Sequence, residues 1–160
     1  GLNNVDNLDK VLKECQRVAK NKAQLLTTFN LPDTMIEFYS AYIDLLDEKG
    51  MTAEKDKLLA HITAKRKTVD DMISILSNYG FYKKQLKLNQ FNMRFLDADA
   101  MFDHYFIQLA FMQPWREILP KEKVEKFFIE LRNLLNQQAH NAGELNLRIP
   151  YACLEMELGK

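Results

Sequence analysis

Residues 88–112 read LNQFNMRFLDADAMFDHYFIQLAFM, and this most apolar stretch of the chain decides the expected fold. Apolar residues recur in it at alternating spacings of three and four, which is the period of an amphipathic helix. The positions that keep this spacing are Leu88, Phe91, Phe95, Ala98, Phe102, Tyr105 and Leu109. Further apolar residues surround them, and a helix that is apolar on several sides is normally a central one. The stretch therefore predicts a long central helix over 81–112.

The same spacing predicts four further helices. Their expected ranges are 4–29, 33–49, 52–79 and 120–141. The breaks fall at residues that end helices or suit their first turn, namely Pro32, Gly50, Gly80 and Pro120. Residues 144–160 alternate in part, but Pro150 interrupts them, so a short extended tail is expected there. Whether this tail is a strand or a packed arm stays open.

The composition favours one helical domain. A chain of 160 residues fits a single core. It holds only five Gly and four Pro, whereas β-sandwiches and barrels need frequent Gly and Pro turns. Short connections between long helices favour antiparallel neighbours. The expected fold is therefore all-α, an up-down bundle of about five helices in a single domain.

The charge balance bears on the partners. The 22 basic and 22 acidic residues cancel, whereas nucleic-acid binders usually carry a basic excess for phosphate contact. Nucleic acid is therefore disfavoured as a partner. No apolar run approaches the roughly 18 residues that a membrane span needs. The chain begins with Gly1 rather than Met, so we expect that its native start is missing, and no compartment is indicated.

Histidines and cysteines lack the spacing of the common cofactor sites. None of His61, His104 and His140 follows a Glu by three positions, as the di-iron carboxylate bundles require. Cys15 and Cys153 lie far apart and form no metal-ligand pair in the sequence. The sequence therefore predicts no metal and no cofactor.

One acidic cluster leaves two interpretations. Asp97, Asp99 and Asp103 lie beside His104, and Asp99 and Asp103 share a helix face. Such carboxylates could hold a metal ion if a second helix supplied further ligands. They are also the residues that a solvated helix face carries, and this second interpretation is the one that we favour.

The segment 127–133 reads FFIELRN and is followed by His140. It resembles the Arg-Asn…His signature of the HEPN superfamily, small helical bundles that include metal-independent ribonucleases of toxin–antitoxin and antiphage systems. The resemblance implies that Arg132 holds phosphate charge, that His140 acts in acid–base chemistry, and that Asn133 belongs to the same motif. Seven residues separate Arg132 from His140, which is more than the family usually has.

The aromatic residues support two interpretations. Rings buried at helical spacing would form a core, in which Met fills gaps. Alternatively, Phe95, Phe102 and Phe106 would line a groove for a partner helix or an apolar ligand. We expect a non-enzymatic interaction domain that binds a protein partner or self-associates through an apolar helix face. The alternatives are the ribonuclease and a carrier of a small apolar ligand.

Overall fold

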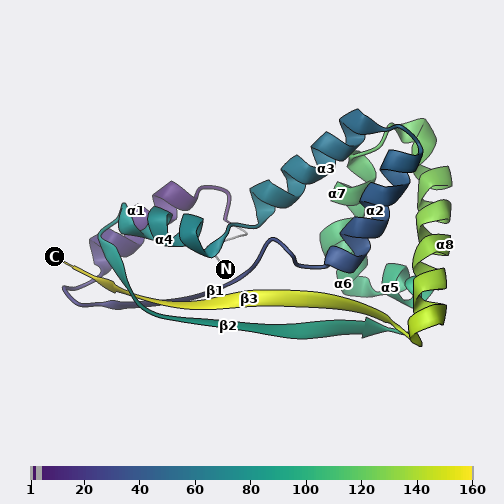
Figure 1. Cartoon of the computed structure of the whole chain (residues 1–160). Coiled ribbons are helices and arrows are strands. Elements are labelled where there is room, and N and C mark those ends of the chain that lie inside the picture. Colours follow the sequence, from purple (N-terminus) through teal and green to yellow (C-terminus); the bar gives the residue numbers. More distant parts are fainter. Residues whose placement is uncertain (1, 3–4, 160) are drawn as a thin grey trace. The chain divides into compact units, whose positions relative to one another are not determined.

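The computed structural model describes residue 2 and residues 5–159, and it combines helices with a three-stranded antiparallel sheet (Figure 1). The expectation of an all-α bundle is therefore wrong. Asn4 and Lys160, the outer limits of two expected elements, lie outside the described residues. The chain forms two compact units. Unit 1 comprises Gly1–Thr34, Ile62–Phe91 and Ile149–Lys160, and unit 2 comprises Met35–His61 and Asn92–Arg148.

The elements follow one another in a mixed order. They are α1 (Leu8–Val18), β1 (Gln24–Asn30), α2 (Ile36–Glu48), α3 (Thr52–Lys65), α4 (Val69–Ser77), β2 (Phe81–Phe95), α5 (Ala98–Asp103), α6 (Tyr105–Ile107), the π-helical turn η2 (Gln108–Met112), α7 (Gln113–Glu117), the 3-10 turn η3 (Lys121–Lys123), α8 (Val124–Ala142) and β3 (Leu145–Leu158). None of the described helices is both long and apolar enough to cross a membrane.

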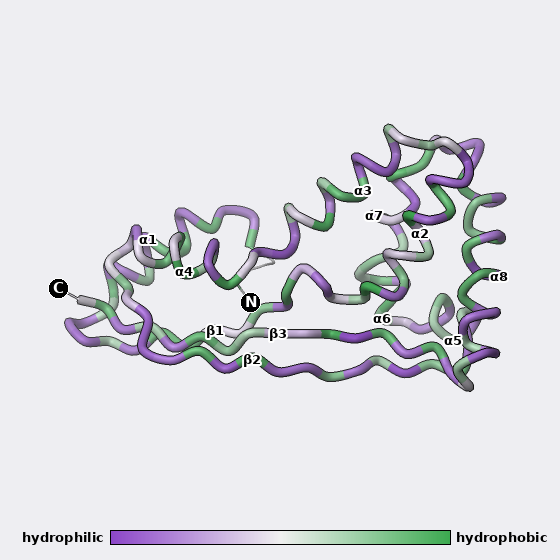
Figure 2. The backbone as a smooth tube through the Cα atoms, in the orientation of Figure 1, coloured by the Kyte–Doolittle hydropathy of each residue, from purple (hydrophilic) through white to green (hydrophobic). Residues whose placement is uncertain are grey.

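The expected central helix over 81–112 is the largest correction. Its first half is the strand β2, and its second half is a series of short helical pieces. Apolar and polar residues alternate over 91–95, which is the period of a strand (Figure 2). A new helix begins only at Ala98, because the Asp97 side chain accepts a hydrogen bond from the Ala100 N–H at 2.8 Å. Apolar residues spaced by three and four positions thus extend across the end of a strand and the start of a helix, although no single helix contains them.

The sheet has the order β1-β3-β2, so the C-terminal segment is its central strand. The expected tail is thus a strand that runs beside both others. Pro150 is tolerated because the β1–β3 register ends at the pair Asn30 and Tyr151, just before the proline would have to donate a hydrogen bond. The Pro150 carbonyl still accepts a hydrogen bond from the Leu31 N–H at 2.9 Å.

The first expected helix, over 4–29, is also shorter than predicted. Helix α1 ends at Val18, and Lys22 lies in the left-handed region with φ 61°. Strand β1 follows, and its side chains alternate between buried and exposed from Thr27 to Asn30. Apolar side chains of β1 such as Leu25 continue the helical stripe, which is why the spacing alone predicts a helix through this strand.

Unit 1 buries its core between one face of the sheet and two helices. Helices α1 and α4 lie over this face (Figure 1). The buried residues are Leu12, Phe29, Met72, Leu76, Phe81, Ala152, Leu154, Met156 and Leu158. The four residues from β3 recur at every second position, so one side of the central strand supplies much of this core.

Unit 2 has an aromatic core. Its rings come from α2, α5, α7 and α8, and they are Phe38, Tyr39, Tyr42, Phe102, Trp115, Phe127 and Phe128. Phe38 stacks on Trp115 with 3.9 Å between ring centroids. The Trp115 indole N–H donates to the Tyr39 hydroxyl at 3.1 Å, so the polar atom of this buried ring is satisfied.

Candidate functional site

Unit 2 carries an exposed apolar surface on α6 and η2. Tyr105, Phe106 and Leu109 form this 105–109 surface, and their exposed fractions are 77%, 48% and 71%. Their neighbour Ile107 is fully buried and holds the segment on the core. Single exposed apolar residues are normal on a protein surface, but adjacent ones often mark an interaction site. The cluster is therefore the strongest candidate binding surface in the described part of the chain.

Local hydrogen bonds fix the course of this segment. His104 separates α5 from α6, and its imidazole Nδ1 accepts a hydrogen bond from the Phe106 N–H at 3.3 Å. The Gln108 side chain donates to the Phe102 carbonyl oxygen at 2.6 Å. The chain then continues into η2, and single π-helical turns of this kind occur frequently at functional sites.

Contacts between aromatic rings connect the surface with the core beneath it. The ring of Phe106 meets that of Phe111 edge-on, with 5.5 Å between centroids. Phe111 in turn stacks on the buried Trp115 at 5.2 Å. Because these rings hold one another, the backbone that bears Tyr105 and Leu109 is fixed although their own side chains are exposed.

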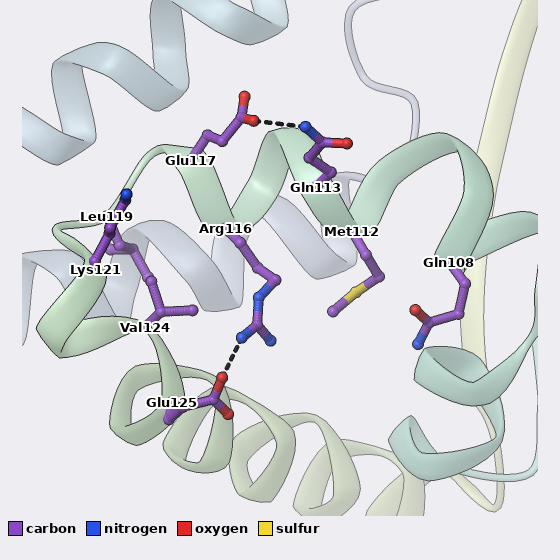
Figure 3. A pocket seen from close by; sticks show the side chains of 9 residues that line it. All are labelled: Gln108, Met112, Gln113, Arg116, Glu117, Leu119, Lys121, Val124 and Glu125. Atoms are coloured by element: carbon purple, nitrogen blue, oxygen red, sulfur yellow. Dashed lines mark hydrogen bonds and ion pairs between the residues drawn. The ribbon is translucent and has the colours of Figure 1, made fainter.

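A groove adjoins the 105–109 surface along η2 (Figure 3). It has a volume of about 680 Å³. The lining residues are Gln108, Met112, Gln113, Arg116, Glu117, Leu119, Lys121, Val124 and Glu125. Met112 and Arg116 project from one helical stretch toward the end of α8 that bears Glu125, and Arg116 forms an ion pair with Glu125. The groove thus combines apolar lining with a charged edge.

The three phenylalanines of the predicted groove have different surroundings. Phe102 is 2% exposed and packs against Phe38 and Phe128 in the aromatic core. Phe95 is half-buried on β2, where its ring lies 5.6 Å from the His104 ring. Only Phe106 belongs to the 105–109 surface. The structure therefore does not bring the three rings together on one open surface, and packed rings surround Phe102.

The residues of the HEPN-like segment are held in another network. Arg132 Nη1 donates to Asp99 Oδ1 at 2.8 Å, and its guanidinium lies 5.5 Å from the centre of the Phe102 ring. Asn133 is exposed. His140 lines a separate pocket, of about 380 Å³, together with Asp97 and other residues of unit 2. Arg132 thus pairs with a carboxylate, and it does not line the pocket that His140 lines.

The acidic cluster takes structural positions. Asp97 caps α5, and Asp99 accepts hydrogen bonds from Arg132 and from the Asn136 side chain. Within residue 2 and residues 5–159, no three His, Cys, Asp or Glu side chains form a group that could hold a metal ion. Cys15 and Cys153 are free thiols, and both are half-buried.

No protein-family model matches this chain, and no curated protein sequence matches it. The 105–109 surface therefore rests on its own geometry. Sequence reasoning placed Tyr105 and Leu109 on the apolar stripe of a buried helix. The sequence did hold one signal for their exposure. Apolar residues surround this segment on more sides than one neighbouring element can cover.

Proposed function

We propose that this chain is a non-enzymatic interaction module that binds a protein partner, or a second copy of itself, through the 105–109 surface. The observation that carries the proposal is the exposure of Tyr105 and Leu109, at 77% and 71%, on a backbone held by buried neighbours. A tyrosine presented on a fixed helical segment is a typical binding anchor, and an exposed leucine beside it adds apolar contact area.

The adjoining groove favours an amphipathic helix as the bound element. Leu109 and Met112 lie on the same helical stretch, and Met112 lines the groove beside Arg116. An apolar helix face laid into such a groove would cover Leu109 and Met112 together. Methionine suits this contact because its flexible thioether adapts to the shape of a bound apolar group. Polar residues of the partner would meet the charged edge that Arg116 and Glu125 form.

Leu109→Lys tests the proposal. Lysine keeps the helix propensity high but places a charge in the centre of the surface. Its matched control is Ile129→Lys, because Ile129 is a 59% exposed apolar residue of α8 in the same unit. Size-exclusion chromatography with light scattering, over a range of concentrations, measures self-association. A partner recovered with the wild-type chain would be purified, and its affinity for each variant measured.

The expected loss of affinity for Leu109→Lys is about thirtyfold, the effect of removing a binding anchor worth about 2 kcal/mol. Ile129→Lys should bind as the wild type does. Equal affinities for the wild type and Leu109→Lys would exclude this surface. Two results together would overturn the interaction function itself. The chain would stay monomeric at all concentrations, and no retained partner would bind the two lysine variants with different affinities.

A further inference from the structure

The two edges of the sheet in unit 1 differ in charge. Strand β1 forms one edge and β2 the other. Within unit 1, β2 carries Lys83, Lys84 and Lys87, whereas β1 reads QLLTTFN and has no charged residue. Exposed sheet edges are usually protected by charged side chains, lysine above all, because their unpaired backbone groups can pair with another chain. The β2 edge has this protection, and the β1 edge lacks it.

Backbone groups of β1 are available for pairing. In an antiparallel ladder, only alternate residues of a strand bond to a given neighbour. The Leu31 N–H donates to the Pro150 carbonyl, so the odd residues of β1 bond to β3. The N–H and C=O groups of Gln24, Leu26, Thr28 and Asn30 therefore point away from β3. Over the described residues, no other segment forms a backbone hydrogen bond with these four.

The face of this sheet opposite α1 and α4 is also uncovered. Leu26 and Phe91 are 63% and 52% exposed there, and the rings of Phe91 and Tyr151 lie with 6.2 Å between their centroids. Tyr151 pairs with Asn30 in the register, so the aromatic pair lies near the end of β1. Leu26 thus places an exposed apolar side chain on the unprotected edge strand β1, and Phe91 adds a second one on β2.

We propose that a protein partner supplies an uncharged β-strand that pairs with β1 as a fourth strand. We further infer that an apolar segment joined to that strand covers Leu26 and Phe91. The absence of charge along β1 is complementary to an uncharged strand, since β1 itself offers no counter-charge to a charge that the partner would bury against it. This inference concerns unit 1 and does not rest on the function proposed for unit 2.

A second copy of this chain could pair with β1, but it would not cover the exposed apolar residues. Two copies of β1 could pair in antiparallel fashion around a two-fold axis perpendicular to the sheet. Such an axis keeps both uncovered faces on the same side. Leu26 and Phe91 of both copies would then stay exposed on that side. A different partner, with a strand and an apolar covering segment, removes both exposed features.

The test uses the full chain and a display library of random seven-residue peptides. Selection is for binding to the wild type, with counter-selection against Thr28→Pro, which removes one outward N–H. Proline is tolerated on an edge strand when its nitrogen faces solvent, so this variant should fold. Leu26→Lys is the second variant, because it adds an edge charge and leaves the backbone intact. Enriched peptides are then synthesised, and amide exchange of the ¹⁵N-labelled chain is measured by NMR.

The selected peptides should be uncharged and should slow amide exchange at Leu26 and Thr28 without slowing exchange in β2. Their affinity for Thr28→Pro should be about tenfold weaker, in line with the loss of one hydrogen bond. Leu26→Lys should also weaken their binding, because its lysine places a charge on the edge that the partner strand covers. The proposal is overturned if no peptide distinguishes the wild type from Thr28→Pro, or if the peptides protect β2. If protection of the β1 amides increases with the concentration of the chain in the absence of peptide, the edge pairs with a second copy. The proposal of a partner strand is then overturned.

Discussion

The Tyr42 hydroxyl donates a hydrogen bond to the Trp115 carbonyl oxygen at 2.9 Å, although the residues are 73 positions apart in the chain. Both side chains are completely buried. The bond joins α2 to α7 inside the aromatic core from which the 105–109 surface projects. Burial raises the pKa of Tyr42 far above its ordinary value, because the phenolate would lose its solvation there.

Replacing Tyr42 by Phe should lower the free energy of unfolding by about 1–3 kcal/mol, because the buried Trp115 carbonyl would lose this partner. Urea unfolding monitored by tryptophan fluorescence measures the change. Tyr105→Phe is the matched control, since the Tyr105 side chain is 77% exposed and should contribute little. Equal destabilisation of the two variants would contradict the buried hydrogen bond.

Alkaline pH should destabilise the wild type more steeply than Tyr42→Phe. The folded-state pKa of Tyr42 is raised above the unfolded value of about 10, so the folded state holds this proton more tightly. The resulting stability is fully present below about pH 10 and is lost as the pH rises toward the folded value. Unfolding free energies measured in urea from about pH 8 to pH 11 test this, and parallel curves for the two proteins would show that Tyr42 is not the group responsible.

Local patterns located the helices that have clear starts and stops. Helix α2 lies within the expected range 33–49, and α8 overlaps the expected range 120–141. Gly50 and Gly143 lie just beyond their ends at φ 65° and 85°, where glycine is favoured because it has no Cβ. Signals of this kind act within a few residues, so they can be recognised without knowing the rest of the fold.

The sheet and the site depend on contacts between distant segments. Strand β2 is set by pairing with a strand about 60 residues later, and short apolar alternation can also match a helical period. The exposure of Tyr105 and Leu109 depends on which elements cover the helix. The three-four spacing identified them as apolar positions of one segment. The apolar residues on several sides of that segment indicate that some of them stay uncovered, but no local pattern states which ones.

Asn136→Ala should destabilise the chain by about 1–3 kcal/mol. The Asn136 side chain accepts a hydrogen bond from the buried Ala98 N–H at 2.7 Å and donates one to Asp99 at 3.0 Å. Alanine removes both bonds and leaves the first amide of α5 without this partner. The control Asn133→Ala changes an exposed asparagine of the same helix and should have little effect. Chemical denaturation measures the free energy of unfolding of both variants. Equal values would show that the Asn136 hydrogen bonds do not stabilise the fold.

Leu154→Ala tests the burial of the central strand β3, in the segment for which the sequence left a strand and a packed arm open. Leu154 lies on the central strand β3, opposite Thr27 of β1, and is completely buried among residues of α1 and α4. Removing its side chain should therefore cost about 2–5 kcal/mol of unfolding free energy through lost burial and the resulting cavity. The matched control is Leu26→Ala on the edge strand, where the side chain is 63% exposed and the cost should be small. Equal unfolding midpoints for the two variants would contradict the complete burial of Leu154 on β3.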